Sequence, residues 1–390
     1  MTIQKDRLWT SDYILLTIGS FFMSLAFYLL IPTLPVFMTE ALHAQKSMIG
    51  WIIASFTLAA LLVRPFAGYA IDTWGRKVFL LSSVLAFAVL FGLHVYITVF
   101  AAFMVLRFIH GLAWGISTTT NSTLVIDIIP SSRRGAGLGY YGLAMPLAMA
   151  FGPLLGLMLM DHSNYPRLFY SGLALGLLAF TLMAIIRYPV FARSKPHPLS
   201  FSRLIEIKAL PVSLIMLLIM TSYGGIISFI TIYAIETGVD KPGMFFTIYA
   251  FGLAASRIFA GNIFDKRGPR ILAPLGTLLV FSGIILLALL PSLTGFLAAA
   301  ALIGIGFGII FPVFQAMVNN LVDPSRRGAA NSSLFTALDL GIGIGSVLTG
   351  YISEFTGLAT AFIVLAATVL SATILFPVFA MPHYLRHKQK

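Results

Sequence analysis

Long apolar runs separated by short polar segments recur along the whole chain. A helix needs about 20 mostly apolar residues to cross the hydrocarbon core of a bilayer. Runs of this kind, bounded by charge, Pro or Gly, predict twelve helices at 13–38, 47–71, 78–97, 99–128, 135–160, 166–187, 210–235, 243–264, 271–290, 293–321, 328–352 and 357–380. Because twelve is even, we expect both termini on the same side of the membrane.

Composition places the chain among polytopic, all-α membrane proteins. Of its 390 residues 59% are hydrophobic and only 10% are charged, where a soluble domain carries about 25% charged residues. The chain has no cysteine, which excludes disulfides, thiolate metal sites and thiol catalysis. It also lacks a nucleotide-binding Gly-Lys-Ser/Thr loop, so ATP drive within the chain is excluded. We expect no cofactor and no metal site.

The basic residues indicate how the predicted helices are oriented. Of the 25 Lys and Arg residues, 19 lie in segments on the side of the termini, 3 lie in loops on the other side, and 3 lie within helices. Cytoplasmic loops carry an excess of Lys and Arg, so both termini and the central loop are predicted to be cytoplasmic. The first apolar run is too long for a cleaved signal peptide, and we expect a multi-pass protein of a bacterial inner (plasma) membrane.

The chain contains an internal repeat at an offset of 193 residues. Arg64-Pro-Phe-Ala-Gly68 recurs as Arg257-Ile-Phe-Ala-Gly261, and the basic pair that ends in Arg134 recurs at Arg327. The repeat predicts two six-helix halves, 1–187 and 210–390, joined by a basic, proline-bearing linker at 188–209. Six crossings give both halves the same orientation, which is the parallel-repeat transporter architecture around a central cavity.

The loop Gly68-Tyr-Ala-Ile-Asp72-Thr-Trp-Gly75-Arg76-Lys77 resembles the signature loop of the major facilitator superfamily, and the second half carries a degenerate copy. The resemblance covers nearly the whole chain and implies a twelve-helix transporter that works by alternating access. It also implies that Asp72 caps the helix at 328–352 in the outward-open state and that Arg76 pairs with Asp127. In the second half Pro269 and Asn320 replace that pair together. A topology-setting turn is the alternative for the loop alone.

By this resemblance the candidate cytoplasmic gate comprises Gly68, Asp72, Gly75, Arg76, Lys77 and Asp127, with Arg64, Arg257, Gly261, Asp265, Gly268 and Arg270. Arg64 and Arg257 lie inside predicted helices, where long side chains can also snorkel to the interface. We interpret both as gate elements, and snorkelling remains the alternative.

The predicted helix at 135–160 carries Gly142, Gly152, Pro153 and Gly156, which resemble a motif that marks antiporters within the superfamily. Gly and Pro allow a helix to bend and to pack closely, and we expect this helix to pack against the one at 243–264. Pro32 and Pro35 resemble a motif of twelve-helix multidrug antiporters. These features favour an exporter, and ordinary small-residue packing is the alternative.

Ionisable groups inside a membrane are costly and indicate function. Of the 13 acidic residues, only Asp339 lies near the middle of a predicted helix. Its face carries Ser332, Thr336, Gly343, Ser346 and Gly350, a small, polar stripe that predicts contact with a cavity or another helix. Asp339 is the candidate proton carrier or cation site, with a structural pair as the alternative.

Arg107 and His110 are the other candidates for proton coupling or substrate contact. Arg107 and Gly111 match the superfamily's Arg-x-x-x-Gly motif, in which the arginine is linked to proton transfer. A lone histidine is also commonly structural, and this alternative stays open for His110. The helix at 13–38 has no acid, so cation recognition by a carboxylate there is unsupported.

Aromatic, Met and polar residues near the predicted midplane suit variable, amphipathic ligands. The candidate cavity-lining residues are Tyr28, Trp114, Asn121, Tyr141, Met145, Met149, Tyr223, Phe311 and Gln315. Packing or lipid-facing positions are the alternative for each of them.

The sequence therefore predicts a monomeric secondary transporter that exports small amphipathic or drug-like molecules by proton antiport. The alternative within the fold is export of a polar or anionic metabolite, a sugar or a metal chelator, contacted by Arg107 and His110. A membrane-embedded enzyme would need a denser catalytic set, and no catalytic residue is assigned. We expect the bilayer, a small-molecule substrate and protons as partners, and no nucleic acid.

Overall fold

The computed structural model describes residues 7–130, 133–160, 164–188, 206–239, 242–323 and 327–388. Within these ranges the chain is helical and contains no strand. All twelve predicted helices are present, with the helix expected at 135–160 formed as two shorter ones. The all-α, twelve-helix fold class is therefore confirmed.

The first six crossings are built from seven α-helices. Their bounds are α1 (Ser11–Glu40), α2 (Lys46–Trp74), α3 (Arg76–Leu93), α4 (Phe100–Ile128), α5 (Arg134–Tyr141), α6 (Ala144–Leu159) and α7 (Tyr165–Ala184). A short 3-10 turn, η1 (His94–Tyr96), extends the end of α3.

The last six crossings begin after the 3-10 turn η4 (Ile207–Ala209). They are α9 (Leu210–Glu236), α10 (Gly243–Arg267), α11 (Pro269–Leu289), α12 (Leu293–Asn320), α13 (Arg327–Thr356) and α14 (Leu358–Leu375). A π-helical turn, η6 (Phe376–Ala380), continues α14 into the short helix α15 (Met381–His387).

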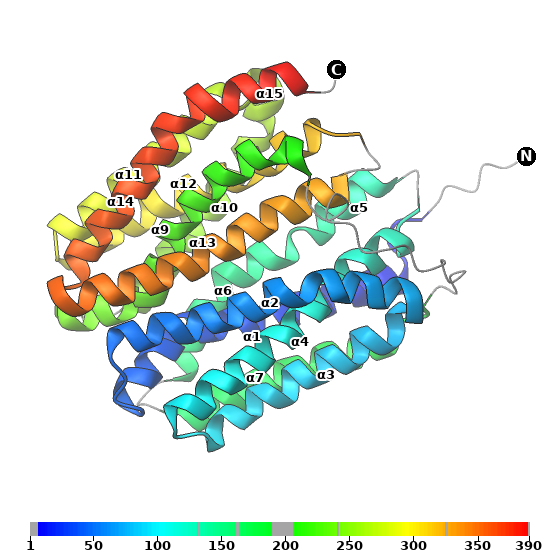
Figure 1. Cartoon of the computed structure of the whole chain (residues 1–390), viewed down its shortest axis with the longest axis horizontal. Coiled ribbons are helices and arrows are strands. Elements are labelled where there is room, and N and C mark those ends of the chain that lie inside the picture. The colour runs from blue at the N-terminus through cyan, green and yellow to red at the C-terminus, as the bar shows by residue number, and fades with distance from the viewer. Residues whose placement is uncertain are drawn as a thin grey trace, which may run out of the picture. The chain divides into compact units, whose positions relative to one another are not determined.

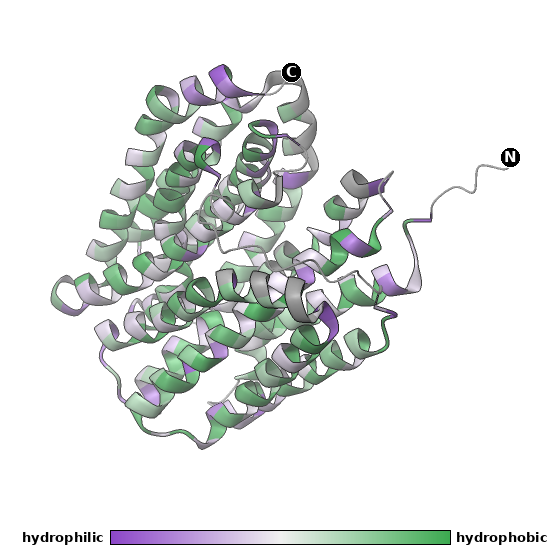
Figure 2. Cartoon of the chain, turned by 45° about the vertical axis from the view of Figure 1, so that its right-hand side comes forward, coloured by the Kyte–Doolittle hydropathy of each residue, from purple (hydrophilic) through white to green (hydrophobic). Residues whose placement is uncertain are grey.

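Ten helices among the described residues are long and apolar enough to cross a membrane. α10 and the α5–α6 pair complete the twelve predicted crossings. Figure 2 shows apolar residues along most of each helix and hydrophilic residues gathered mainly near helix ends. The chain is a multi-pass membrane protein.

The repeat seen in the sequence is reproduced in the helix boundaries. α4 begins at Phe100 and α12 begins 193 residues later at Leu293, and the starts of α3, α5 and α7 are related to those of α11, α13 and α14 by the same offset. Gly75 and Gly268, also 193 apart, precede α3 and α11 with φ values of 99° and 66°. Only glycine adopts such values without strain, so both copies use it to turn the chain.

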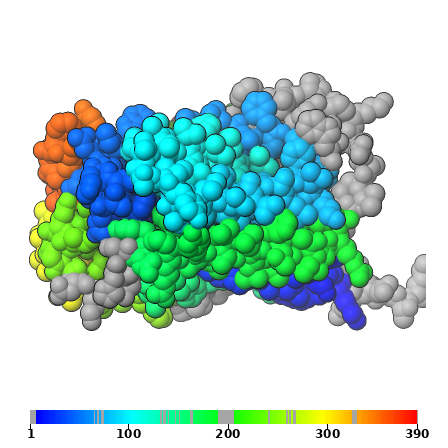
Figure 3. All heavy atoms as spheres, turned by 90° about the horizontal axis from the view of Figure 1, so that it is seen from below, coloured from blue at the N-terminus to red at the C-terminus, as the bar shows by residue number. Residues whose placement is uncertain are grey.

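By their internal contacts the residues form two compact units, one of Met1–Thr33 with Leu58–Leu199 and one of Leu34–Thr57 with Ser200–Lys390. In the first unit α3 packs between α4 and α7, and Figure 3 shows α7, in green, lying along α3, in light blue. In the second unit α9 runs beside α13 (Figure 1), and α12 contacts α10 and α11. The division into halves at the linker 188–209 stays a prediction.

Both units use glycine at the same place to bring two helices together. In the first, a Cβ on Gly115 of α4 would lie 2.7 Å from the carbonyl oxygen of Ala60 in α2. In the second, a Cβ on Gly308 of α12 would lie 2.6 Å from the carbonyl oxygen of Leu253 in α10. Both residues of each pair are related by the 193-residue offset, so the duplicated sequence builds the same backbone contact twice.

The helix predicted at 135–160 is interrupted at Gly142 and Leu143. The Leu143 N–H donates to the Tyr140 carbonyl over 3.1 Å, which closes a tight turn between α5 and α6. Pro146 then lies in the first turn of α6, where its missing N–H is tolerated. In the second copy the residue at the Pro146 position is Asp339, and α13 is continuous.

We expect Gly308→Ala to destabilise the second unit by about 1–3 kcal/mol, because the added methyl group would overpack the α10–α12 contact. Gly343→Ala in α13 is the matched control, since its Cβ would meet no described atom closer than 3.4 Å. Thermal unfolding in detergent measures both. Equal midpoints for the two variants would contradict the packing argument.

Candidate functional site

Polar side chains are half-exposed along adjoining faces of α12 and α13. The Asn331 amide donates to the Asn319 side-chain oxygen over 2.8 Å, and the Asn319 amide donates to the Gln315 carbonyl over 2.9 Å. Ser332, Thr336 and Asp339 continue the same stretch of α13, and none of them is buried. We call this surface the α12–α13 polar face. Polar groups in spanning helices face water or a polar ligand rather than lipid.

Aromatic rings lie within the α12–α13 polar face. Phe311 of α12 and Phe335 of α13 have ring centroids 6.2 Å apart, and both side chains are partly exposed. Arg257 of α10 places its guanidinium 5.4 Å from the centroid of the Phe311 ring. Asp339 follows Phe335 by one helical turn. The face thus combines a cation, a carboxylate and two rings within one unit.

The part of the α13 stripe beyond Asp339 contacts other helices. The Ser346 hydroxyl lies 3.0 Å from the Ser228 hydroxyl and donates to the Gly224 carbonyl of α9 over 3.2 Å. A Cβ on Gly350 would lie 2.5 Å from the Lys46 carbonyl oxygen at the start of α2. A Cβ on Gly50 would lie 2.6 Å from the Ser346 carbonyl oxygen. The start of α2 therefore packs backbone to backbone on α13.

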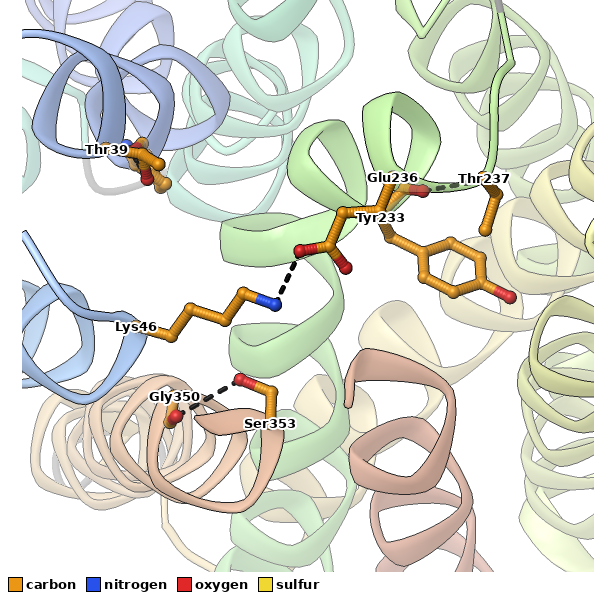
Figure 4. Close-up of polar contacts among 8 residues, drawn as sticks. Thr39, Lys46, Tyr233, Glu236, Thr237, Gly350 and Ser353 are labelled. Atoms are coloured by element: carbon orange, nitrogen blue, oxygen red, sulfur yellow. Dashed lines mark hydrogen bonds and ion pairs between the residues drawn. The ribbon is translucent and has the colours of Figure 1, made fainter. Parts of the chain in front are cut away.

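Charged groups fasten the start of α2 in the second unit. Lys46 forms an ion pair of 2.5 Å with Glu236 at the end of α9, and Figure 4 shows this contact beside Gly350 and Ser353 of α13. The Ser47 N–H donates to the Glu354 carboxylate over 3.1 Å, at a helix start that favours negative charge. We call these contacts of Lys46, Ser47, Glu236 and Glu354 the α2 clamp.

Sequence reasoning did not identify the α2 clamp. The one available signal is that Lys46 is among only three basic residues predicted on its side of the membrane, where charges are scarce. The Lys46 and Glu236 side chains are 25% and 42% exposed. The ion pair therefore contributes on the order of 1 kcal/mol or less to stability. The close backbone contacts at Gly50 and Gly350 make the packing surfaces of α2 and α13 complementary.

The ion pair expected between Arg76 and Asp127 is present in the first unit, at 2.5 Å. Lys77, the next residue, holds its ammonium 5.7 Å from the centroid of the Tyr188 ring. The Tyr188 hydroxyl donates to the Met183 carbonyl over 2.9 Å, and burial raises the pKa of this phenol. The loop after α2 is thus fixed to the ends of α4 and α7, and Tyr188 was not anticipated from the sequence.

The second copy of the loop makes a different contact. Asn320, which replaces the aspartate, donates its amide to the Tyr384 hydroxyl of α15 over 3.3 Å. Pro269 occupies the first turn of α11, and Arg270 is exposed. The surroundings of Gly68, Asp72, Gly261 and Asp265 lie outside what the structure describes. Their gate roles and the capping by Asp72 therefore stay predictions. Arg64 is half-buried.

The candidate face of α4 packs against α3. Arg107 donates to His110 Nδ1 over 3.3 Å, and the His110 ring lies 4.4 Å from that of Phe87. The Ser117 hydroxyl donates to Ser83 over 2.9 Å. Arg107 and His110 are buried. This geometry supports the structural alternative for His110, and a coupling role for either residue stays a prediction.

The candidate cavity-lining residues fall into two groups. Five are buried in their own units: Tyr28, Trp114, Asn121, Met149 and Tyr223. Trp114 stacks on Phe27 at 4.4 Å. Four are partly exposed: Tyr141, Met145, Phe311 and Gln315. The partly exposed group agrees better with an accessible surface, and the lining role of all nine stays a prediction.

The glycines of the antiporter-like motif lie against α1. A Cβ on Gly152 would lie 2.5 Å from the Tyr28 Cβ, and one on Gly156 would collide with the Leu29 carbonyl. In the second copy Gly345 contacts Thr221 at the positions related to Gly152 and Tyr28. Gly152 is thereby explained by packing common to both halves. The antiporter prediction then rests on Pro153, which Ser346 replaces in the second copy, and on the exposed Gly142.

Comparison with known proteins identifies the family. The family model described as Major Facilitator Superfamily matches residues 16–242 and 212–390. The chain belongs to this superfamily, as the signature loop and the repeat predicted. Because the relatives and structural neighbours are transporters, the chain is a transporter rather than an enzyme.

The chain is similar to transporters of this superfamily over most of its length. The staphylopine export protein of Staphylococcus aureus is 23% identical over 356 residues, covering 86% of this chain and 87% of the relative. An uncharacterized transporter of the same type from Methanocaldococcus jannaschii is 24% identical over 335 residues, covering 82% and 86%.

Solved structures agree in fold. A bacterial homologue of the human lysosomal transporter Spinster, inward-facing and occupied, has a TM-score of 0.79 at 15% identity, covering 97% of this chain and 98% of its own. The human organic anion transporter has a TM-score of 0.72 at 17% identity, covering 94% and 98%. At these identities the likeness shows the fold alone.

We expect Asp127→Asn to destabilise the first unit by about 1–2 kcal/mol, because it leaves Arg76 partly buried without its carboxylate. The double variant Arg76→Gln/Asp127→Asn should lose no more than either single variant, since the interaction is then removed as a unit. Thermal unfolding in detergent provides the measurement. Arg270→Gln, exposed in the second copy, is the control, and additive losses at 76 and 127 would contradict the pairing.

Proposed function

We propose that this protein is a secondary active transporter that exports small molecules in exchange for protons. Its membrane is the bacterial inner membrane, its termini are cytoplasmic and it acts as a monomer. The observation that carries the proposal is the half-exposed Asp339 on the α12–α13 polar face. A carboxylate within a spanning helix is a functional candidate by its cost alone, and its partial exposure gives protons access to it.

The arrangement of α2 supports alternating access. Its first part, through Thr57, belongs to the second contact unit, and the part from Leu58 belongs to the first. The α2 clamp lies at the start of this helix, and the loop held by Arg76 follows its end. In the proposed cycle the clamp contacts break when the binding surface opens outward, and the Arg76 contacts break when it opens inward. Weak, partly exposed pairs suit this exchange.

The substrate class rests on the side chains of the polar face. Its rings suit the apolar part of an amphipathic molecule, while its amides suit polar groups. The relatives carry names that specify staphylopine, nucleosides and organic anions, so membership of the superfamily leaves both candidate classes in place: drug-like amphipathic compounds, and polar or anionic metabolites.

We expect Asp339→Asn to abolish substrate-triggered proton release in everted vesicles, because the amide cannot exchange a proton. The panel comprises lipophilic cations, neutral drugs and organic anions. Asp323→Asn, which removes an exposed carboxylate after α12, is the control and should behave as the parent. Undiminished proton release by the Asp339 variant would return this residue to a structural role.

We expect the α2 clamp to protect Ser353, which is 3% exposed on α13. In the cysteine-free chain, Ser353→Cys supplies a single thiol. Combining it with Lys46→Ala and Glu354→Gln should raise labelling by an impermeant maleimide in intact cells several-fold, because the clamped state loses stability. Lys208→Ala is the control. Unchanged labelling would count against the clamp, and labelling confined to everted vesicles would reverse the proposed topology.

A further inference from the structure

Arg257 carries a positive charge within α10, and no acidic side chain among the described residues forms an ion pair with it. Its Nε is buried and makes no hydrogen bond, and among the described residues the side chain forms neither a hydrogen bond nor an ion pair. Its guanidinium makes a cation–π contact with the Phe311 ring. A charge within a spanning helix needs a partner or water, and a ring quadrupole supplies only part of that compensation.

The Arg257 guanidinium lies over a ring of the neighbouring helix α12. The Nε of Arg64, the equivalent residue of the first half, is buried as that of Arg257 is, and Arg64 also takes part in further interactions.

A second polar group lies near Arg257. Tyr249, two turns earlier on α10, is 1% exposed and interacts with both Tyr223 and Arg257. A neutral phenol does not balance the charge of the guanidinium, which therefore favours an incoming acceptor of negative charge.

We propose that Arg257 binds the anionic group of an amphipathic organic anion whose apolar body packs on Phe311 and Phe335. The rings are partly exposed, and their centroids lie 6.2 Å apart, so a flat hydrocarbon can lie against either of them. A guanidinium pairs with a carboxylate through two parallel hydrogen bonds, which a lysine cannot reproduce. This inference rests on the proposed export function and names its substrate class.

The test compares probes with one body and different charges. Purified transporter in detergent is titrated with 2-naphthoate, 2-naphthamide and 2-naphthylmethylammonium, and binding is followed as thermal stabilisation. Inorganic phosphate alone reports a bare-anion site. We expect stabilisation by naphthoate, and little by the amide, the ammonium or phosphate. Equal stabilisation by the amide or the ammonium, or none by naphthoate, overturns the proposal, as does phosphate binding as tightly as naphthoate.

Variants assign the effect to the residue. Arg257→Gln should weaken naphthoate binding about tenfold or more, and Arg257→Lys should fall between this variant and the parent. Phe311→Leu should weaken naphthoate binding through the lost ring. Arg386→Gln, exposed on α15, is the charge-matched control and should bind as the parent does. Unliganded melting temperatures identify any variant that fails to fold, in which case Arg257→Lys carries the test. Parental affinity in both Arg257 variants overturns the proposal.

The same variants separate this inference from the export function. Asp339→Asn should lose proton release and keep naphthoate binding. If naphthoate binds through Arg257 but no compound drives proton release in parental vesicles, proton export fails and the anion site stands. If cations or neutral drugs drive proton release that Arg257→Gln leaves unchanged, export stands and the anion site fails.

Discussion

The structure depends on one constraint, which is that a backbone inside hydrocarbon must satisfy its own hydrogen bonds. The apolar runs therefore become helices, and departures from helix need a local solution. At Gly142 and Leu143 the chain closes a tight turn. At Gly75 and Gly268 it turns through positive φ between spanning helices. The few polar side chains left inside the helices are therefore the candidates for the specific chemistry.

Duplication separates the architectural residues from those that have diverged. Gly115 and Gly308 perform the same packing task in the two copies, as do Gly152 and Gly345. Other paired positions make different contacts in the two copies: Asp127 forms an ion pair with Arg76, whereas Asn320 donates a hydrogen bond to Tyr384. Pro146 lies in the first turn of α6, whereas Asp339 at the equivalent position lies in the middle of the continuous helix α13. The second half thus carries the carboxylate within a spanning helix, while the first half keeps the charged loop.

The helices and the 193-residue repeat could be predicted, because apolar length and self-similarity are read directly from the sequence. The Arg76–Asp127 pair was implied by the resemblance of the loop after α2 to the superfamily's signature loop, and its joint replacement in the second half supported it. The neighbour that covers a given helix face was harder to predict. Helical spacing placed His110 and Ser117 on one face of α4, but spacing does not say that α3 covers that face. The contact of Lys46 with Glu236 joins residues 190 positions apart that share no periodic signal. Tyr188 follows the last predicted crossing of the first half, where no pattern marks a partner for Lys77.

The divided membership of α2 has a consequence for the protein as an assembly of fragments. Residues Leu34–Thr57 come from the first repeat but make their contacts with the second. If the chain were cut in its central linker, the carboxy-terminal polypeptide would lack part of its compact unit, since the amino-terminal fragment carries the hairpin that belongs with it. Reassembly of such fragments would be templated by this exchanged segment, much as swapped elements join separate copies of a protein.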